Sequence, residues 1–217
     1  MVEQPIPQPR GRPYRMQRRL ETIEETRRRI TAAAFELHAT IGPSRTTIRA
    51  IADRAGVQRH TVYAHFPDLD ELYRACTEHG IRVTGMPEPE PWSAIADPRD
   101  RLHLGLTELF AWYRANEQML RNVLSDVDPT APPAVEPDLF DLRMSSLFDT
   151  LAAGWTIRDE RAQPMLLAVL GHAMAFETWR SLTGGGLTDE GAVGLLAAVV
   201  GGVGDGTIAG PTGSAGP

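Results

Sequence analysis

The chain has 217 residues, and 42% of them are hydrophobic, which is enough to bury the core of one large domain or two small ones. No run of about 18 apolar residues and no apolar signal segment appears, so neither membrane insertion nor export is indicated and we expect a cytoplasmic protein. The single cysteine, Cys76, cannot form an internal disulfide, and we expect a buried, unreactive thiol.

The net charge of −6 is unevenly distributed along the chain. Residues 1–82 hold 14 Arg against 10 acidic residues, a net charge of +4, whereas residues 83–217 hold 8 Arg against 18 acidic residues, a net charge of −10. The overall charge argues against a nucleic-acid partner, but the basic N-terminal part is compatible with one.

The first 20 residues contain four prolines and five arginines with little apolar periodicity, so residues 1–20 are predicted to form a disordered basic arm. A helix is predicted to begin at Thr22, which matches a capping box with Glu25, and to end at Gly42-Pro43. The apolar residues of this helix fall on one face: Ile30, Ala33, Ala34, Leu37 and Ile41.

Three shorter helices are predicted over residues 47–55, 58–66 and 68–80. The last of these follows Pro67 and opens on a second capping-box pattern, Asp68 with Glu71. Its apolar or aromatic side chains are Leu69, Leu72, Tyr73 and Cys76. Residues 21–82 are therefore predicted to form one small helical domain.

A proline-acid linker at residues 86–91 precedes a second, larger helical domain predicted over residues 92–203. Its predicted helices cover residues 98–113, 116–127, 138–153, 159–183 and 188–203, and no strand pattern competes with them. Residues 204–217 are rich in Gly, Pro, Ser and Thr and are predicted to be a disordered tail. The predicted fold class is all-α.

A glycine, Gly56, separates the two short helices at 47–55 and 58–66, and this spacing is typical of a helix-turn-helix. Ala52 and Val62 supply the small and apolar residues that let two such helices pack closely, and Gly56 tolerates the positive φ of the turn. The second helix then projects polar side chains that suit base edges and phosphates in a major groove: Gln58, Arg59, His60, Thr61, Tyr63 and His65. The alternative is an ordinary solvated helix face.

The stretch TTIRAIADRAGVQRHTVYAHFPDLDEL, residues 46–72, resembles the signature of the TetR family of bacterial transcriptional regulators. The matching motifs are Ile51-Ala52, Ala55-Gly56-Val57 and Tyr63-Ala64-His65-Phe66. The resemblance is specific over about residues 25–80, and beyond them it concerns the order of helices and the last two helical patterns. It implies a helix-turn-helix DNA-binding domain of three to four helices followed by a larger helical domain for ligand binding and dimerisation.

The resemblance also implies a homodimer that binds a palindromic DNA operator and, as a repressor, is released by a small-molecule effector. The expected DNA contacts are Thr47, Arg49, Gln58, Arg59, His60, Thr61, Tyr63 and His65. Two positions depart from the family pattern: Leu69 stands where a phosphate-binding lysine is frequent, and His60 where glycine or another small residue is frequent. Arginines of the arm are candidates to replace the missing cation: Arg10, Arg12, Arg15, Arg18 and Arg19.

Apolar stripes on the last two helical patterns are the expected dimer interface: Leu167, Leu170, Met174, Trp179, Leu195, Leu196, Val199 and Val200. These stripes could instead face the domain's own core. Aromatic, methionine and histidine residues are candidates for an effector pocket, although ordinary core is the alternative: His103, Phe110, Trp112, Tyr113, Met144, Phe148, Trp155, His172 and Phe176. No metal site is expected, since neither His103 nor His172 has a second ligand at helical spacing. No cofactor is expected.

Two other functions remain open on the sequence alone. An architectural DNA-binding protein without an effector would carry the same helix-turn-helix. An all-helical enzyme is disfavoured, because the sequence contains no Gly-rich phosphate loop, no paired carboxylates at helical spacing in an apolar setting and no Gly-x-Ser-x-Gly motif.

Overall fold

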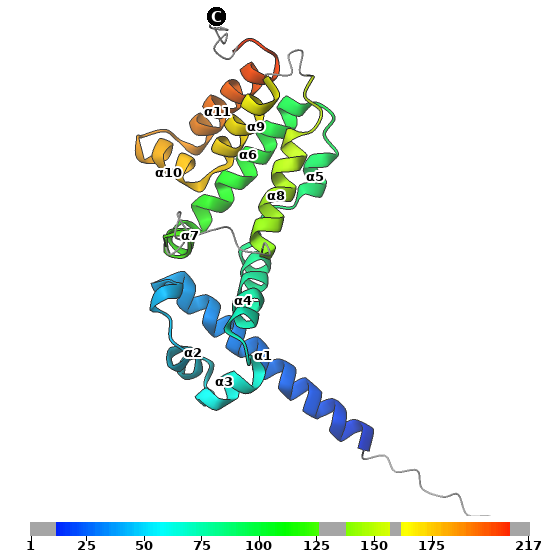
Figure 1. Cartoon of the computed structure of the whole chain (residues 1–217), viewed down its shortest axis with the longest axis vertical. Coiled ribbons are helices and arrows are strands. Elements are labelled where there is room, and N and C mark those ends of the chain that lie inside the picture. The colour runs from blue at the N-terminus through cyan, green and yellow to red at the C-terminus, as the bar shows by residue number, and fades with distance from the viewer. Residues whose placement is uncertain (1–11, 126–137, 157–161, 209–217) are drawn as a thin grey trace, which may run out of the picture. The chain divides into compact units, whose positions relative to one another are not determined.

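The computed structural model describes residues 12–125, 138–156 and 162–208, and every regular element within these ranges is a helix (Figure 1). The predicted all-α class is therefore confirmed. The chain divides into two compact units, of which unit 1 comprises residues 1–79 and 122–127 and unit 2 comprises residues 80–121 and 128–217. Within the described residues, no helix combines the length and the hydropathy that a membrane span requires.

Unit 1 is built on a long N-terminal helix. Its elements are α1 (Arg12–Ile41), the 3-10 turn η1 (Pro43–Arg45), α2 (Ile48–Ala55), α3 (Arg59–His65) and the first turns of α4 (Leu69–Thr84). The core contains apolar residues from all four helices, among them Ile30, Ile51, Val62, Phe66 and Leu72, each at most 4% exposed. The short helices thus gain their stability from packing on α1 rather than from their own length.

The first helix begins earlier than predicted. Residues 12–20, expected to be disordered, belong to α1, and residues 1–11 lie outside the described part of the chain. Pro13 does not prevent this, because proline fits the first turn of a helix, where its missing N–H has no partner to lose. Thr22 lies inside the helix and its hydroxyl donates to the Arg18 carbonyl at 2.8 Å, so the predicted cap there is wrong.

The start of α4 is capped by one residue of the predicted pair. The Asp68 carboxylate accepts a hydrogen bond from the Asp70 backbone N–H at 3.0 Å. Glu71 does not complete a capping box, because its carboxylate instead accepts from Arg27 of α1 at 2.8 Å. The capping-box prediction is therefore only half correct at this helix.

Cys76 lies in the core of unit 1, where it is 4% exposed. Its Sγ is 3.3 Å from Nδ1 of His38 on α1. Burial raises the pKa of the Cys76 thiol to about 12, so the reactive thiolate is not formed at neutral pH. The expectation of a packed, unreactive thiol is confirmed.

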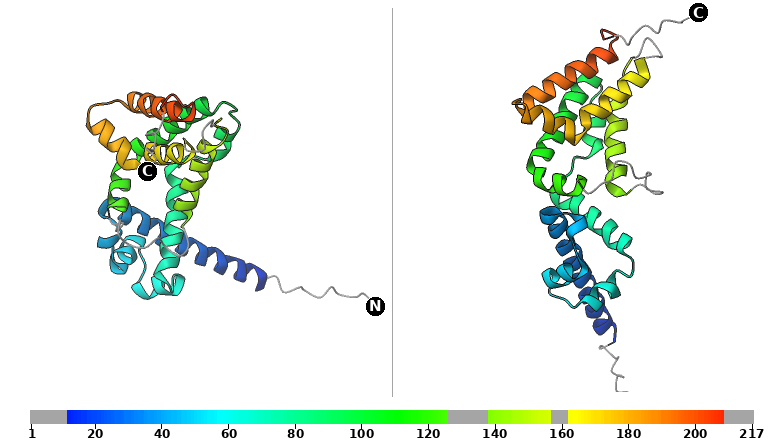
Figure 2. Two further views of the ribbon diagram at one scale, coloured as in Figure 1. Left: turned by 45° about the horizontal axis from the view of Figure 1, so that its top comes forward. Right: turned by 60° about the vertical axis from the view of Figure 1, so that its left-hand side comes forward.

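Unit 2 surrounds one central helix, α6 (Pro98–Ala115), which contacts α5, α8, α9 and α11 (Figure 2). The other helices are α5 (Pro89–Ser93), α7 (Glu117–Leu124), α8 (Leu139–Ala152), α9 (Ala162–Met174), α10 (Phe176–Gly184) and α11 (Asp189–Gly204), with α7 beginning in unit 2 and ending in unit 1. Leu102, Leu106, Leu109 and Phe110 of α6 are fully buried.

Two elements of unit 2 differ from the prediction. Part of the predicted linker forms α5, which is anchored by the fully buried Trp92, whose indole N–H donates to Glu108 at 2.6 Å. The single helix predicted over residues 159–183 is two helices, α9 and α10, separated at the extended residue Ala175. The Tyr113 hydroxyl donates to the Met174 carbonyl at 2.5 Å, which satisfies an acceptor that the break would otherwise leave buried and unpaired.

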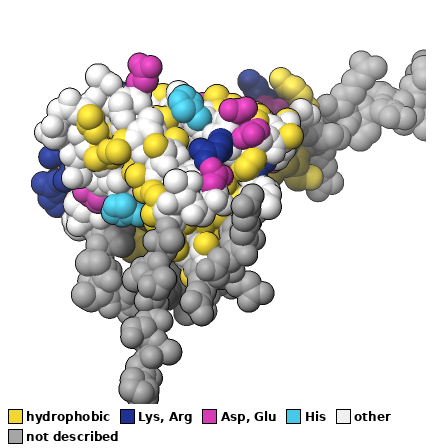
Figure 3. All heavy atoms as spheres, turned by 90° about the horizontal axis from the view of Figure 1, so that it is seen from above, with side chains coloured by type: hydrophobic (Ala, Val, Ile, Leu, Met, Phe, Trp, Pro, Cys, Tyr) yellow, Lys and Arg dark blue, Asp and Glu magenta, His cyan; other side chains and the backbone are white. Residues whose placement is uncertain are grey.

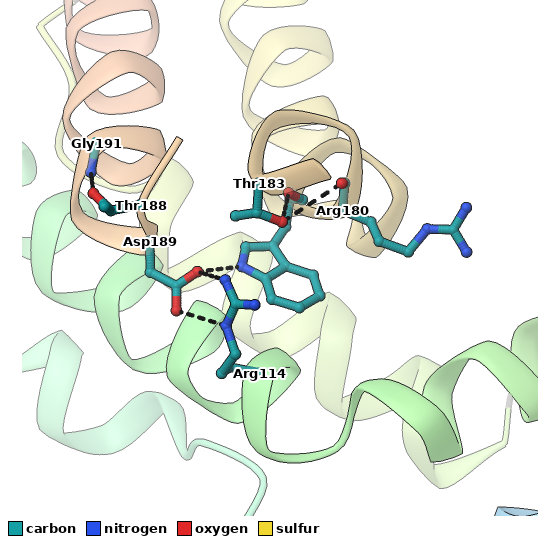
Figure 4. Close-up of polar contacts among 7 residues, drawn as sticks. Arg114, Arg180, Thr183, Thr188, Asp189 and Gly191 are labelled. Carbon is teal, nitrogen blue, oxygen red and sulfur yellow. Dashed lines mark hydrogen bonds and ion pairs between the residues drawn. The ribbon is translucent and has the colours of Figure 1, made fainter. Parts of the chain in front are cut away.

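A polar cluster joins α6, α10 and α11 (Figure 4). Arg114 donates to both carboxylate oxygens of Asp189, at 2.6 and 3.1 Å, and the Trp179 indole N–H donates to the same carboxylate at 2.9 Å. The Arg114 guanidinium lies 4.8 Å from the centre of the Trp179 ring. The Arg114 hydrogen bonds, with that of Trp179, hold the pKa of Asp189 below its usual value.

Candidate nucleic-acid interface

The turn between α2 and α3 depends on Gly56. Its φ of 65° is left-handed, a conformation that glycine adopts without steric cost. The Val57 N–H then donates to the Ala52 carbonyl at 3.0 Å, as in a glycine-terminated helix end. Ala52 and Val62 are each 1% exposed where the two helices meet. The predicted roles of Ala52, Gly56 and Val62 in the helix-turn-helix are confirmed.

Arg29 of α1 holds this turn from the other side. Its guanidinium donates to the carbonyl of Ala55 and, at 3.3 Å, to the carbonyl of Gly56. These are free acceptors at the negative end of the α2 dipole, so the cation both pairs them and interacts favourably with the dipole. Arg29 was not predicted as a functional residue, although the run Arg27-Arg28-Arg29 inside a predicted helix was the available signal.

Arg27, also missed from the sequence, holds the far end of α3. One guanidinium nitrogen donates to the His65 carbonyl at 2.6 Å and the other to Glu71 of α4 at 2.8 Å. The same guanidinium lies 4.1 Å from the centre of the Phe66 ring. Two arginines of α1 therefore fix both ends of the segment from Ala55 to Glu71.

The side chains held by this framework face solvent. Gln58, Arg59, His60 and Tyr63 are exposed, and Thr61 and His65 are half-buried. The N-terminal half of α3 borders a groove that it shares with α2, lined among others by Arg49, Asp53, Gln58, Arg59 and His60. A helix N-terminus with donors of this kind can hydrogen-bond to acceptors on base edges and phosphates.

The remaining predicted contacts of unit 1 lie around this groove or on α1. The Thr47 hydroxyl caps α2 by accepting from the Ala50 N–H at 3.1 Å. Arg49 is 80% exposed and lies 3.8 Å from Asp53. Leu69, at the position where a lysine was expected, is 57% exposed, so α4 offers no cation there. Arg15, Arg18 and Arg19 are exposed on α1, whereas Arg10 lies outside the described residues.

The sequence profile of the family described as bacterial regulatory proteins, tetR family, matches residues 30–76, which span the helix-turn-helix and its supporting helices. Residues 30–76 therefore carry a DNA-binding domain of the TetR family. This domain supports a role in DNA binding and transcription regulation.

The fold is similar to that of a solved TetR transcription regulator from Haloarcula marismortui, with a TM-score of 0.55 and 18% sequence identity over 84% of this chain and 98% of that one. A second solved structure, RolR in complex with the ligand resorcinol, matches with a TM-score of 0.43 and 19% identity over 85% of this chain and 94% of that one.

The effector-pocket candidates fall into two groups. Phe110, Trp112, Tyr113 and Phe176 are buried and in ring contact, with centroid distances of 5.4 Å for Tyr113–Phe176 and 5.6 Å for Trp112–Tyr113. The others are partly buried or exposed: Met144, Phe148 and Trp155 are half-buried, and His103 and His172 are exposed. The buried Trp112 indole nitrogen has no hydrogen-bond partner among the described residues.

Most of the predicted dimer residues lie inside unit 2. Leu170, Trp179 and Val200 are fully buried, and Met174 and Leu196 are at most 8% exposed. These side chains therefore belong to the unit's own core, which was the alternative for the apolar stripes. Leu167 and Val199 are half-buried, and Leu195 is 47% exposed.

Proposed function

We propose that this TetR-family regulator is a homodimeric repressor that leaves a palindromic operator when a small molecule binds unit 2. The observation that carries the proposal is the exposed polar row on α3, which Gly56, Arg27 and Arg29 hold in one position. A pre-organised row of donors reads base edges without a large ordering cost on binding.

The N-terminal half of α3 is the proposed base-reading segment. Arg59 suits the two acceptors of guanine and Gln58 suits adenine, whereas Thr61 and Tyr63 can reach phosphate oxygens. His60 brings a ring to a position where the family often has a small side chain, and it borders the groove between α2 and α3. The operator of this protein is accordingly expected to differ from those of relatives with glycine there.

Replacing Arg59 by alanine is expected to weaken binding to the operator by about 1–3 kcal/mol, or roughly 5- to 150-fold, and to relax base preference at one position of each half-site. The operator is first selected from a genomic library and footprinted, and affinity is then measured by fluorescence anisotropy. Arg74→Ala is the matched control, because Arg74 is an exposed arginine of α4 away from the groove. Protection that spreads without a defined site would support the architectural alternative and contradict the proposal.

The proposed dimer surface is the exposed face of α9 and α11, which pack against each other in unit 2. Most of its residues are small or apolar and follow helical spacing on both helices: Ala168 and Gly171 on α9, beside the polar His172, and Gly194, Leu195 and Ala198 on α11. Small side chains let the helices of two copies approach closely, and a two-fold axis presents the same face from each copy.

We expect Ala198→Glu to convert the dimer into a monomer of 23.8 kDa, because a two-fold contact brings a buried carboxylate from each copy toward its symmetry mate. Light scattering after size exclusion measures the mass. Ala111→Glu, on the exposed side of α6, is the matched control and is expected to stay dimeric. A wild-type protein that is monomeric at micromolar concentration, or an Ala198→Glu variant that keeps the dimer mass, would refute this surface.

The proposed effector site is centred on the aromatic cluster of α6 and α10. Trp112 supports this choice, because its buried indole N–H has no partner among the described residues and can donate to a ligand acceptor. Helix α4 is the element proposed to transmit effector binding to α3. It is one unbroken helix that begins in unit 1 and ends in unit 2, and Arg27 connects it to the end of α3. A coupling of about 1–3 kcal/mol would change operator affinity by roughly 5- to 150-fold.

A further inference from the structure

The first turns of α1 have no role in the core of unit 1. Residues 12–25, here called the α1 extension, form the dark blue end of the helix, which extends beyond the rest of unit 1 in Figure 1. Every described side chain from Tyr14 to Glu25 is exposed, including Met16 and Leu20 at 65% and 61%. A helix of this length with no packing partner is marginal in water, so a binding partner would stabilise it.

The helical repeat shows which side of the extension faces the same way as α3. The buried face of α1, marked by Ile30 and Ala34, belongs to the core that α1 shares with α2, α3 and α4. At about 100° per residue, Arg19 points within about 20° of the direction of Ile30, and Arg15 within about 60° of it. Ile23 also lies within about 20° of this direction. The side continuous with the recognition helix is therefore basic and apolar.

The opposite side of the extension is acidic. By the same repeat Glu21 points about 180° from Ile30, and Glu24 and Glu25 lie about 120–140° from it. Glu21 accepts a hydrogen bond from Gln17 at 3.2 Å, and Glu25 pairs with Arg28 at 2.7 Å. By contrast, no acidic side chain within the described residues pairs with Arg15 or Arg19.

The two sides of the extension differ in charge. On the face drawn in Figure 3, basic and acidic side chains lie interspersed rather than gathered by sign. Within the extension, Arg15 and Arg19 lie toward the side of Ile30 without an acidic partner among the described residues, whereas Glu21, Glu24 and Glu25 lie on the other side together with Arg18. Such a pattern favours an anionic partner that approaches from the α3 side.

We propose that the α1 extension lies along the DNA backbone next to the bases read by α3, where Arg15 and Arg19 bind phosphates flanking each half-site. The proposal rests on the proposed function, since it needs α3 in the major groove. Exposed Leu69 leaves the start of α4 without a phosphate contact, and the extension supplies cations to the same interface. Its 14 residues span about 21 Å, equivalent to about 6 base pairs of B-DNA.

The double variant Arg15→Gln/Arg19→Gln tests this placement. Each phosphate contact contributes about 0.9 to the slope of log K against log salt, so the loss of two contacts per protomer is expected to flatten the slope for a bound dimer by about 3–4. The double variant should also bind equally well to the full operator and to one trimmed of about 6 flanking base pairs on each side, whereas the wild type should lose affinity on trimming. Glutamine and arginine have similar helix propensity, so circular dichroism should be unchanged.

Arg28→Gln is the matched control, because it removes the same charge from the far side of α1, about 160° from Ile30. Its salt slope and its trimming response should equal those of the wild type. If the wild type binds its operator through α3 but the double variant keeps the wild-type slope, the extension does not contact DNA and this inference is overturned. If no defined operator is found, the proposed function itself fails, which is a separate outcome.

Discussion

Replacing Trp179 by alanine is expected to lower the free energy of unfolding of unit 2 by about 3–5 kcal/mol. Trp179 is fully buried and contacts Tyr113 and Phe176 at ring distances of 5.8 and 5.5 Å. Its removal leaves a cavity and takes one donor from the Asp189 carboxylate (Figure 4). All four tryptophans lie in unit 2, so urea unfolding followed by the fluorescence of the remaining three reports on this unit.

The variant Trp179→Phe separates packing from hydrogen bonding. Phenylalanine keeps most of the ring contact but cannot donate to Asp189, which still accepts from Arg114 at 2.6 Å. We expect a loss of about 1–3 kcal/mol, smaller than for alanine, because a hydrogen bond to a charged group is lost but the carboxylate keeps its cation. Equal destabilisation by both substitutions would show that the indole N–H, rather than the buried ring, dominates. A loss below about 1 kcal/mol for alanine would contradict the described packing.

Replacing Gly56 by valine is expected to destabilise unit 1 by about 2–5 kcal/mol and to weaken operator binding more than tenfold. The φ of 65° costs a residue with a Cβ about 1–2 kcal/mol, and a β-branched side chain tolerates it least. A Cβ on Gly56 would also lie 3.0 Å from the Arg29 guanidinium, and displacing that group would free the carbonyl ends of α2. Thermal unfolding by circular dichroism and operator titration measure the two effects.

Gly85→Val provides the matched control, because Gly85 has nearly the same backbone, with φ 64°, but no atom within 4 Å of an added Cβ. It should show only the conformational cost of about 1–2 kcal/mol. Gly85 lies in unit 2, so its loss is read from the unfolding of that unit, and a larger loss at Gly56 is attributed to the contact with Arg29. If both variants lose the same stability, Arg29 does not hold the turn as described.

The helix-turn-helix could be predicted from sequence because its signals are local. Gly56 must adopt a positive φ, and the apolar residues around it recur at helical spacing, so neither depends on the rest of the chain. The predicted bounds of α2 and α3 differ from the structure by at most one residue, which is within the usual disagreement over helix termini. Arg27 and Arg29 could not be assigned in this way, because their acceptors lie 26 to 44 residues further along the chain.

Unit 2 was harder to predict because its last helix, α11, is apolar on every side after its first turn. Periodicity identifies a buried face only where another face is polar, and α11 has apolar or glycine residues at most positions from Gly191 to Gly204. The predicted dimer interface included the largest apolar side chains, Leu170 and Trp179 among them, and these side chains are buried inside unit 2. The break at Ala175 also has no local signal, since no proline or glycine stands there and the Tyr113 contact comes from another helix.

The single, buried cysteine makes the transient opening of unit 1 measurable by thiol labelling. Cys76 is buried against α1, so a disulfide reagent in solution can modify it only during the moments when α1 and α4 part. Because the chain has no second cysteine, the labelling rate divided by the intrinsic rate of an exposed thiol gives the equilibrium constant for opening. The opening equilibrium of the unmodified protein can thus be compared with and without DNA, and no dye has to be attached.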